Sequence, residues 1–189
     1  MQKDSILNII LVGVGLCIVC GAVISTVAVS LKDQQEQNVI FDQQSKIIDA
    51  ARLLEVYPSS QEALASIEEV VVNLNDGQPS GFPPEQYDLD SILRDSSQHT
   101  VLNGSDDIAM ISVRENLSKV YIEYRNNELK TLILPVRGYG LWGTLYGYLA
   151  LDSDLNTIVG LEFYKHKETP GLGAEVDNPN WKKLWNGKK

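Results

Sequence analysis

The stretch that decides the fold covers residues 120–165 and reads VYIEYRNNELKTLILPVRGYGLWGTLYGYLALDSDLNTIVGLEFYK. Four of its segments predict strands because apolar side chains alternate with polar ones or form short apolar runs: 120–124, 129–136, 146–150 and 157–165. Asn126-Asn127 and Asp152-Ser153-Asp154 supply turns, and Gly138-Tyr139-Gly140 is expected to break the second strand. Neighbouring strands joined by short turns predict an antiparallel meander.

A short helix is predicted after the last strand. Asn178 would cap it and Pro179 would take the first helical position, where a missing N–H costs nothing. Trp181, Leu184 and Trp185 are spaced to form its buried face.

Helices are predicted before the strands. Apolar residues recur at helical spacing over 33–56, and Pro58 ends the run. Ser59-x-x-Glu62 is a capping box that opens a second helix over 60–73. Residues 74–105 are rich in Asn, Asp, Gly, Pro and Ser, so they are interpreted as a long connection that could hold a short helix.

An apolar run occupies residues 6–31, ILNIILVGVGLCIVCGAVISTVAVSL. These uncharged residues exceed the roughly 20 that a membrane-spanning helix needs. A cleaved signal peptide is the alternative, since Ala28-Val29-Ser30 resembles a cleavage site, but signal peptides have apolar regions of only about 7–15 residues. We therefore expect a retained single-pass anchor, with too few flanking basic residues to fix its orientation.

The fold class predicted from these segments is α+β. Residues 1–32 would be a transmembrane anchor, 33–75 a helical stem, and 76–189 a small antiparallel-sheet domain. With a formal net charge of −9, the chain is a poor candidate for binding nucleic acid.

Several apparent motifs lack the context that their chemistry needs. Cys17 and Cys20 lie on one face of the apolar helix, where helix packing is the simpler interpretation and a redox or metal role the alternative. Gly138-x-Gly140-x-x-Gly143 matches a dinucleotide fingerprint but precedes a strand instead of a helix. Asp152-x-Asp154-x-Asn156 lacks the glycine and glutamate of a calcium loop, and His99 and His166 show no zinc spacing.

The loop from Lys165 to Gly173 is harder to explain as structure alone. Pro170-Gly171 suits a type II turn, which would hold Leu172 outward, and Gly173 allows close backbone approach. The loop is either an ordinary connection or a ligand contact.

The string Glu168-Thr-Pro-Gly-Leu-Gly173 resembles the loop of the FMN-binding domain family. That family includes the NqrC component of the sodium-pumping NADH:quinone oxidoreductase and the RnfG component of the Rnf complex. Three further segments are more similar to the NqrC branch: Gln44–Ile47, Gly140-Leu141-Trp142 and Glu175–Trp181.

The resemblance implies a flavin-carrying electron-transfer component of a complex in the bacterial inner membrane, with its domain on the periplasmic side. It would work with other membrane subunits to pass electrons from NADH toward quinone, coupled to sodium export. Trp142, Thr169 and Leu172 match positions near the flavin ring, and Glu168, Gly171 and Gly173 match the loop that shapes this contact. Packing in a core or a place in an interface belt is the alternative for Trp142. No acid, base, nucleophile or metal site is predicted.

The family joins FMN through its phosphate to the last threonine of a Ser-Gly-Ala-Thr-x-Thr motif. This sequence contains no such motif, so we expect the chain to be truncated and the covalent threonine to lie beyond Lys189. The alternatives are a membrane-anchored assembly or binding module without flavin, and the RnfG branch of the family.

Overall fold

The computed structural model describes residues 6–189, which divide into one unit up to Phe41 and another from Asp42 to Lys189. Helix α1 (Ile6–Ala50) contains the predicted anchor except for residues 1–5, which lie outside the described residues. It is long and apolar enough to cross a membrane, since its uncharged 26-residue run rises about 39 Å.

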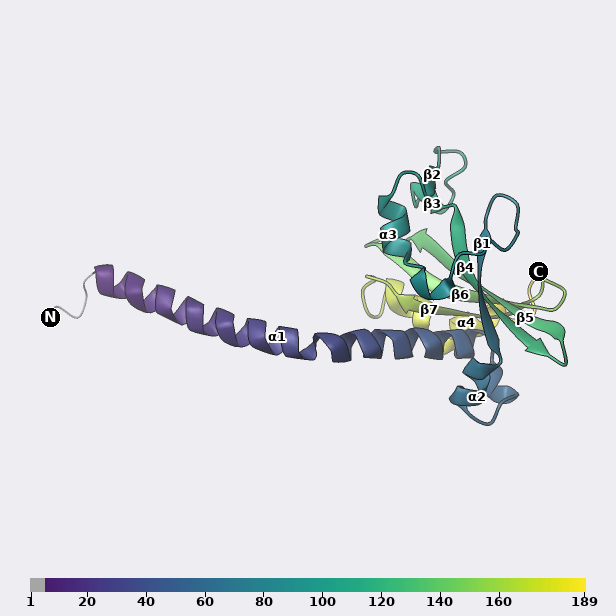
Figure 1. Ribbon diagram of the computed structural model, residues 1–189, viewed down its shortest axis with the longest axis horizontal. Coiled ribbons are helices and arrows are strands. Elements are labelled where there is room, and N and C mark those ends of the chain that lie inside the picture. The colour runs from purple at the N-terminus through teal and green to yellow at the C-terminus, as the bar shows by residue number, and fades with distance from the viewer. Residues whose placement is uncertain (1–5) are drawn as a thin grey trace. The chain divides into compact units, whose positions relative to one another are not determined.

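The second unit is built on a five-stranded antiparallel sheet (Figure 1). Its strand order is β1-β4-β5-β6-β7, and the strands span Ile67–Asn73, Leu117–Arg125, Glu128–Tyr139, Thr144–Asp152 and Ile158–Lys165. The predicted meander is confirmed as β4 to β7. Asn126 and Asn127 both have positive φ, as a two-residue hairpin turn requires.

Shorter elements surround this sheet. Strands β2 (His99–Val101) and β3 (Val113–Glu115) form a separate two-stranded sheet. The α-helices are α2 (Ser60–Ala65), α3 (Leu89–Arg94) and α4 (Pro179–Lys182). The 3₁₀ turns are η1 (Leu53–Glu55), η2 (Pro84–Gln86), η3 (Gly173–Asp177) and η4 (Lys183–Trp185). The expected long connection over 74–105 therefore contains η2, α3 and β2.

The helix expected over 33–56 ends early, at Ala50. Arg52 adopts a left-handed conformation with φ of 53°, which stops the helix before η1. The last turn of α1 approaches β7 so closely that a β-carbon on Gly160 would collide with the carbonyl oxygen of Ala50. This contact places the end of α1 on the sheet.

The helix expected over 60–73 is wrong in its second half. The Ser59 hydroxyl does cap α2, accepting the Glu62 N–H at 3.3 Å, but α2 ends at Ala65. Residues 67–73 instead form β1, paired antiparallel with β4 from Ile67↔Glu123 to Asn73↔Leu117. The β-branched run Val70–Val72 suits a strand, and a partner far along the chain supplies its hydrogen bonds.

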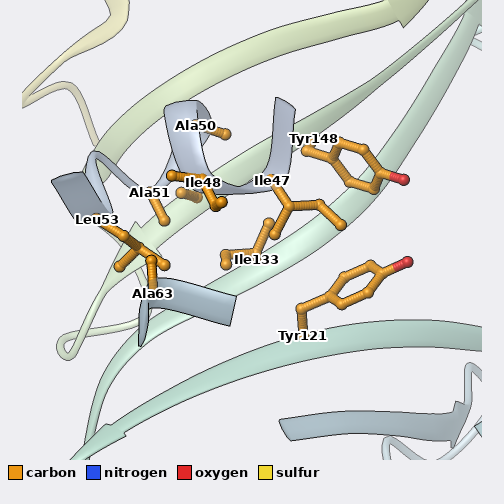
Figure 2. Close-up of a cluster of buried hydrophobic side chains, with 10 residues drawn as sticks. Ile47, Ile48, Ala50, Ala51, Leu53, Ala63, Tyr121, Ile133 and Tyr148 are labelled. Carbon is orange, nitrogen blue, oxygen red and sulfur yellow. The ribbon is translucent and has the colours of Figure 1, made fainter. Parts of the chain in front are cut away.

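The main core lies between the sheet and the segments that precede it (Figure 2). Ile47 from the end of α1 packs near Tyr121 of β4, Ile133 of β5 and Tyr148 of β6. Tyr121 and Tyr148 meet edge to face, with ring centroids 5.7 Å apart. The core thus joins residues 47–63 to the central strands.

Two further expectations need correction, one in β5 and one in the last helix. Gly138 does not break the second strand, because β5 continues to Tyr139 and pairs with β6 there. Asn178 caps α4 as predicted, accepting the Asn180 N–H at 2.9 Å, and Trp181 packs near Phe163 and Trp185. Leu184 and Trp185, however, are 63% and 37% exposed, so the expected buried face is not formed at these two positions.

Candidate functional site

Two loops meet at one end of the sheet. The first, residues 140–143, joins β5 to β6 in a tight turn closed by the Gly140 N–H and the Gly143 carbonyl, 2.8 Å apart. The second begins where β7 ends. Tyr146 at the start of β6 is paired with Lys165 at the end of β7, so the meander itself brings the loops together.

The second loop contains the predicted turn. Gly171 has φ of +74°, and the Leu172 N–H donates to the Thr169 carbonyl at 3.1 Å. These features match a type II turn with Pro170 and Gly171 at its centre. The same carbonyl accepts the Ala174 N–H at 3.2 Å, which fixes the turn to the start of η3.

Glu168 connects the two loops. Its side chain is buried, and its Oε1 accepts the backbone N–H of Trp142 at 3.0 Å. A β-carbon on Gly140 would lie 2.5 Å from Oε1, and one on Gly173 would collide with Oε2. The carboxylate therefore fills space that both glycines leave open.

Three large apolar side chains are exposed on these fixed loops. Trp142 is 62% exposed and Leu172 is 72% exposed, and Leu141 faces solvent as well. The expectation that Leu172 points outward is confirmed, and the alternative of core packing for Trp142 is wrong. Exposed indole and leucine surfaces at one site are suited to contact with a flat apolar ring.

The sequence prediction named six site residues: Trp142, Glu168, Thr169, Gly171, Leu172 and Gly173. The structure brings all of them to these two loops through the Glu168 contacts. The contact of these six residues with a flavin stays a prediction.

Other residues of the site were not predicted. His166 bonds both Glu168 and Asp177, and Gly143 leaves room for the side chain of Lys167. A third segment lies alongside, since the Ala109 carbonyl accepts the Tyr139 N–H at 2.8 Å. Sequence spacing carries no signal for the Asp177, Gly143 and Ala109 contacts, because each joins segments that only the fold brings together, whereas the His166–Glu168 contact is local.

Metal and nucleotide motifs gain no support. Among residues 6–189, no three His, Cys, Asp or Glu side chains cluster as metal ligands would. Gly138-x-Gly140-x-x-Gly143 leads into β6, as predicted, and therefore does not open a helix. Asp154 serves a turn, accepting the Thr157 N–H at 2.7 Å.

Comparison with known proteins places these loops in a functional context. The family described as FMN-binding domain matches residues 140–189. The NqrC protein of the Na(+)-translocating NADH-quinone reductase of Pseudomonas aeruginosa is 43% identical over 99% of this chain and 74% of its own length. The corresponding protein of Vibrio vulnificus is 38% identical over 100% of this chain and 74% of its own.

Solved structures agree with this result. NqrC of Shewanella oneidensis matches 77% of this chain and 68% of its own, with a TM-score of 0.68 and 31% sequence identity. The corresponding protein of Parabacteroides distasonis matches 84% of this chain and 70% of its own, with a TM-score of 0.60 and 29% identity.

Proposed function

This chain belongs to the NqrC family of the Na(+)-translocating NADH-quinone reductases, and we propose that it carries FMN and relays electrons toward quinone. Its family makes it part of an oxidoreductase complex, and the curated relatives at 43% and 38% identity are NqrC proteins, which favours this branch over the RnfG branch. The electron relay and its coupling to sodium export are our inference from that membership.

The observation that carries the proposal is the rigid presentation of Trp142 and Leu172. Both side chains are exposed. The hydrogen bond from its N–H to Glu168 fixes the backbone of Trp142, and the turn from Thr169 fixes the backbone of Leu172. Exposing apolar surface on a fixed loop costs free energy unless a partner covers it. Both residues fall within the segment that matches the FMN-binding domain.

The residues present fit a flavin ring. Trp142 and Leu172 would form apolar contacts with it, with Thr169 beside them, while Glu168, Gly171 and Gly173 keep the loops in place. At Gly171 a β-carbon would meet open space, so the backbone there can be approached closely. FMN supplies one- and two-electron redox chemistry when bound, and the protein positions the ring and limits water around it.

We further propose that the flavin phosphate is joined to a threonine beyond Lys189. The support is the resemblance to the family, together with the absence of a Ser-Gly-Ala-Thr-x-Thr string from these 189 residues. Thr169 is not assigned this role, because it belongs to the Glu168–Gly173 motif and has a place in the type II turn there.

We also propose a periplasmic location for the sheet domain, with α1 crossing the inner membrane. Residues 1–32 would be the anchor, in contact with lipid, followed by a stem that leads into the domain. The uncharged run of α1 supports the spanning role. The partners would be the other membrane subunits of the complex.

The test is the flavin content of the protein purified in detergent from its own membranes. We expect the native protein to carry about one flavin per chain. Trp142→Ala and Leu172→Ala should change the visible flavin spectrum and increase ring exposure to a water-soluble quencher. Leu184→Ala is the matched control, because Leu184 is exposed outside both loops.

A flavin-free native protein would contradict the proposal. The chain would then be better described as a membrane-anchored assembly module. If the flavin spectrum were the same in Trp142→Ala, Leu172→Ala and the native protein, the proposed contact would be wrong, although the protein would still carry flavin.

A further inference from the structure

The imidazole of His166 lies at the base of the loop that carries Leu172. His166 directly follows β7, and its side chain is mostly buried, at 17% exposure. Its Nε2 lies 2.7 Å from Oδ2 of Asp177, the last residue of η3. Its Nδ1 lies 3.2 Å from the backbone nitrogen of Glu168. One ring therefore contacts both ends of the 166–177 segment.

These two contacts define which ring nitrogen carries the hydrogen. A backbone N–H can only donate, so Nδ1 must offer its lone pair to Glu168. The hydrogen then resides on Nε2 and is donated to the Asp177 carboxylate. The neutral Nε2–H form satisfies both partners, whereas hydrogen on Nδ1 would break the contact to Glu168.

The contact to Glu168 continues to the apolar wall of the site. His166 holds the backbone of Glu168, and the Glu168 side chain holds the backbone of Trp142 at 3.0 Å. Asp177, His166, Glu168 and Trp142 thus form a hydrogen-bonded series that starts at η3 and ends on the β5–β6 loop. These contacts add to the backbone hydrogen bonds that close each loop, and they reduce the conformational freedom that the loops retain relative to one another.

We propose that His166, oriented by Asp177, is a positioning residue that fixes Glu168 and thereby sets Trp142 against the flavin. The proposal rests on the proposed function, because it assigns His166 a role at the same site. His166 itself need not touch the flavin, and it acts through the geometry of Glu168.

Two substitutions distinguish the contact of His166 with Glu168 from its contact with Asp177. In His166→Asn the amide oxygen can stand where Nδ1 stands and accept the Glu168 N–H. In His166→Gln the amide group reaches instead toward the position of Nε2 and Asp177. The proposal therefore expects Asn to preserve the Glu168 contact and Gln to lose it.

The readouts are taken on the detergent-solubilised native protein with its flavin. Loss of one hydrogen bond of ordinary strength changes the ratio of fixed to displaced Trp142 loop by about two- to tenfold. We expect flavin fluorescence in His166→Gln to rise toward that of Trp142→Phe, as indole quenching is lost. His166→Asn should stay close to the native protein.

Nuclear magnetic resonance adds a readout independent of the flavin. In the native protein the imidazole nitrogen shifts of His166 should report the neutral Nε2–H form. The backbone amide signals of Glu168 and Trp142 should move in His166→Gln and remain in His166→Asn. The imidazole measurement on the native protein needs no variant to fold.

Hydrogen on Nδ1 in the native protein would overturn the proposal. Unchanged Trp142 and Glu168 amide signals in His166→Gln would overturn it as well. If the native protein carries no flavin, the proposed function fails, while the amide and imidazole signals still decide whether the series positions Trp142.

Discussion

Glu168 is 8% exposed between Gly140 and Gly173, so the candidate site depends on two residues that leave the β-carbon position empty. A buried carboxylate needs hydrogen-bond donors, and the Trp142 N–H is one of them. The same contact that satisfies the carboxylate also fixes the loop that presents the indole ring.

Gly173→Ala tests this packing directly. The new methyl group would collide with Oε2 of Glu168 and force the side chain or η3 to move. We expect a loss of about 1–3 kcal/mol in the free energy of unfolding, measured by denaturant titration. Gly104→Ala is the control, since a methyl group there meets open space.

A stability of Gly173→Ala equal to that of Gly104→Ala would show that the Glu168 side chain moves freely. The connection between the two loops would then not depend on its buried position.

One part of the candidate site could be predicted from residue chemistry alone. Pro170-Gly171 implies a turn that holds Leu172 outward, and the structure contains this turn. The Asp177–His166 contact could not be predicted, because it depends on where η3 returns to the end of β7. The resemblance to a family supplied the flavin, which residue chemistry alone left open.

At the scale of elements, the meander was predictable because turns and alternating side chains are local signals. Strands β4 to β7 need only their neighbours in the chain for pairing. Strand β1 was mistaken for helix because its partner lies about 50 residues away and the capping box favoured a longer helix. Tertiary pairing overrode the local preference there.

The turn between β6 and β7 predicts a measurable pKa. The Thr157 hydroxyl, 2.6 Å away, is the main cause that lowers the pKa of Asp154 to about 2, and backbone N–H groups add to it. Thr157→Val should raise the pKa toward 3.8, as measured by carbon NMR of the carboxyl group, and Thr157→Ser should restore it.

Because the pKa of Asp154 is lower in the folded protein than in the unfolded chain, the free energy of unfolding depends on pH. The turn contributes stability above pH 3.8, where the carboxyl group is ionised in both states, and loses it as the pH falls through about 2. A pKa for Asp154 that is the same in Thr157→Val and the native protein would contradict the assignment.

The buried tyrosines of the sheet lead us to expect that the protein unfolds at alkaline pH. Burial raises the pKa of Tyr121, Tyr148 and Tyr164, which lie on three strands in one aromatic cluster. Their neutral rings contribute stability below about pH 10, where the unfolded chain is also neutral, and this contribution is lost at higher pH as the unfolded state ionises.

The measurement is tyrosinate absorbance followed together with circular dichroism. We expect the absorbance of these three rings to rise only as the sheet unfolds, and Tyr121→Phe to move that transition to higher pH. Ionisation near the ordinary tyrosine pKa of about 10 with an intact sheet would mean that the cluster is open to solvent.

For the whole molecule, we propose that the apolar helix anchors the chain in the membrane and that the acidic sheet domain holds the flavin. The described part of α1 is suited to a membrane, while the loops of the sheet domain present the candidate flavin contact. The chain's membership of the NqrC family gives both parts one context, that of a NADH-quinone reductase complex.

The most direct test of the central claim is the intact mass of the native protein, purified from its own membranes and measured after denaturation. Our account predicts a mass increment equal to FMN joined through a phosphoester, on a peptide that contains a threonine beyond Lys189. A denatured protein whose mass is that of its polypeptide alone would contradict covalent attachment, and if the undenatured protein also lacked flavin, the flavin-carrying role would be wrong.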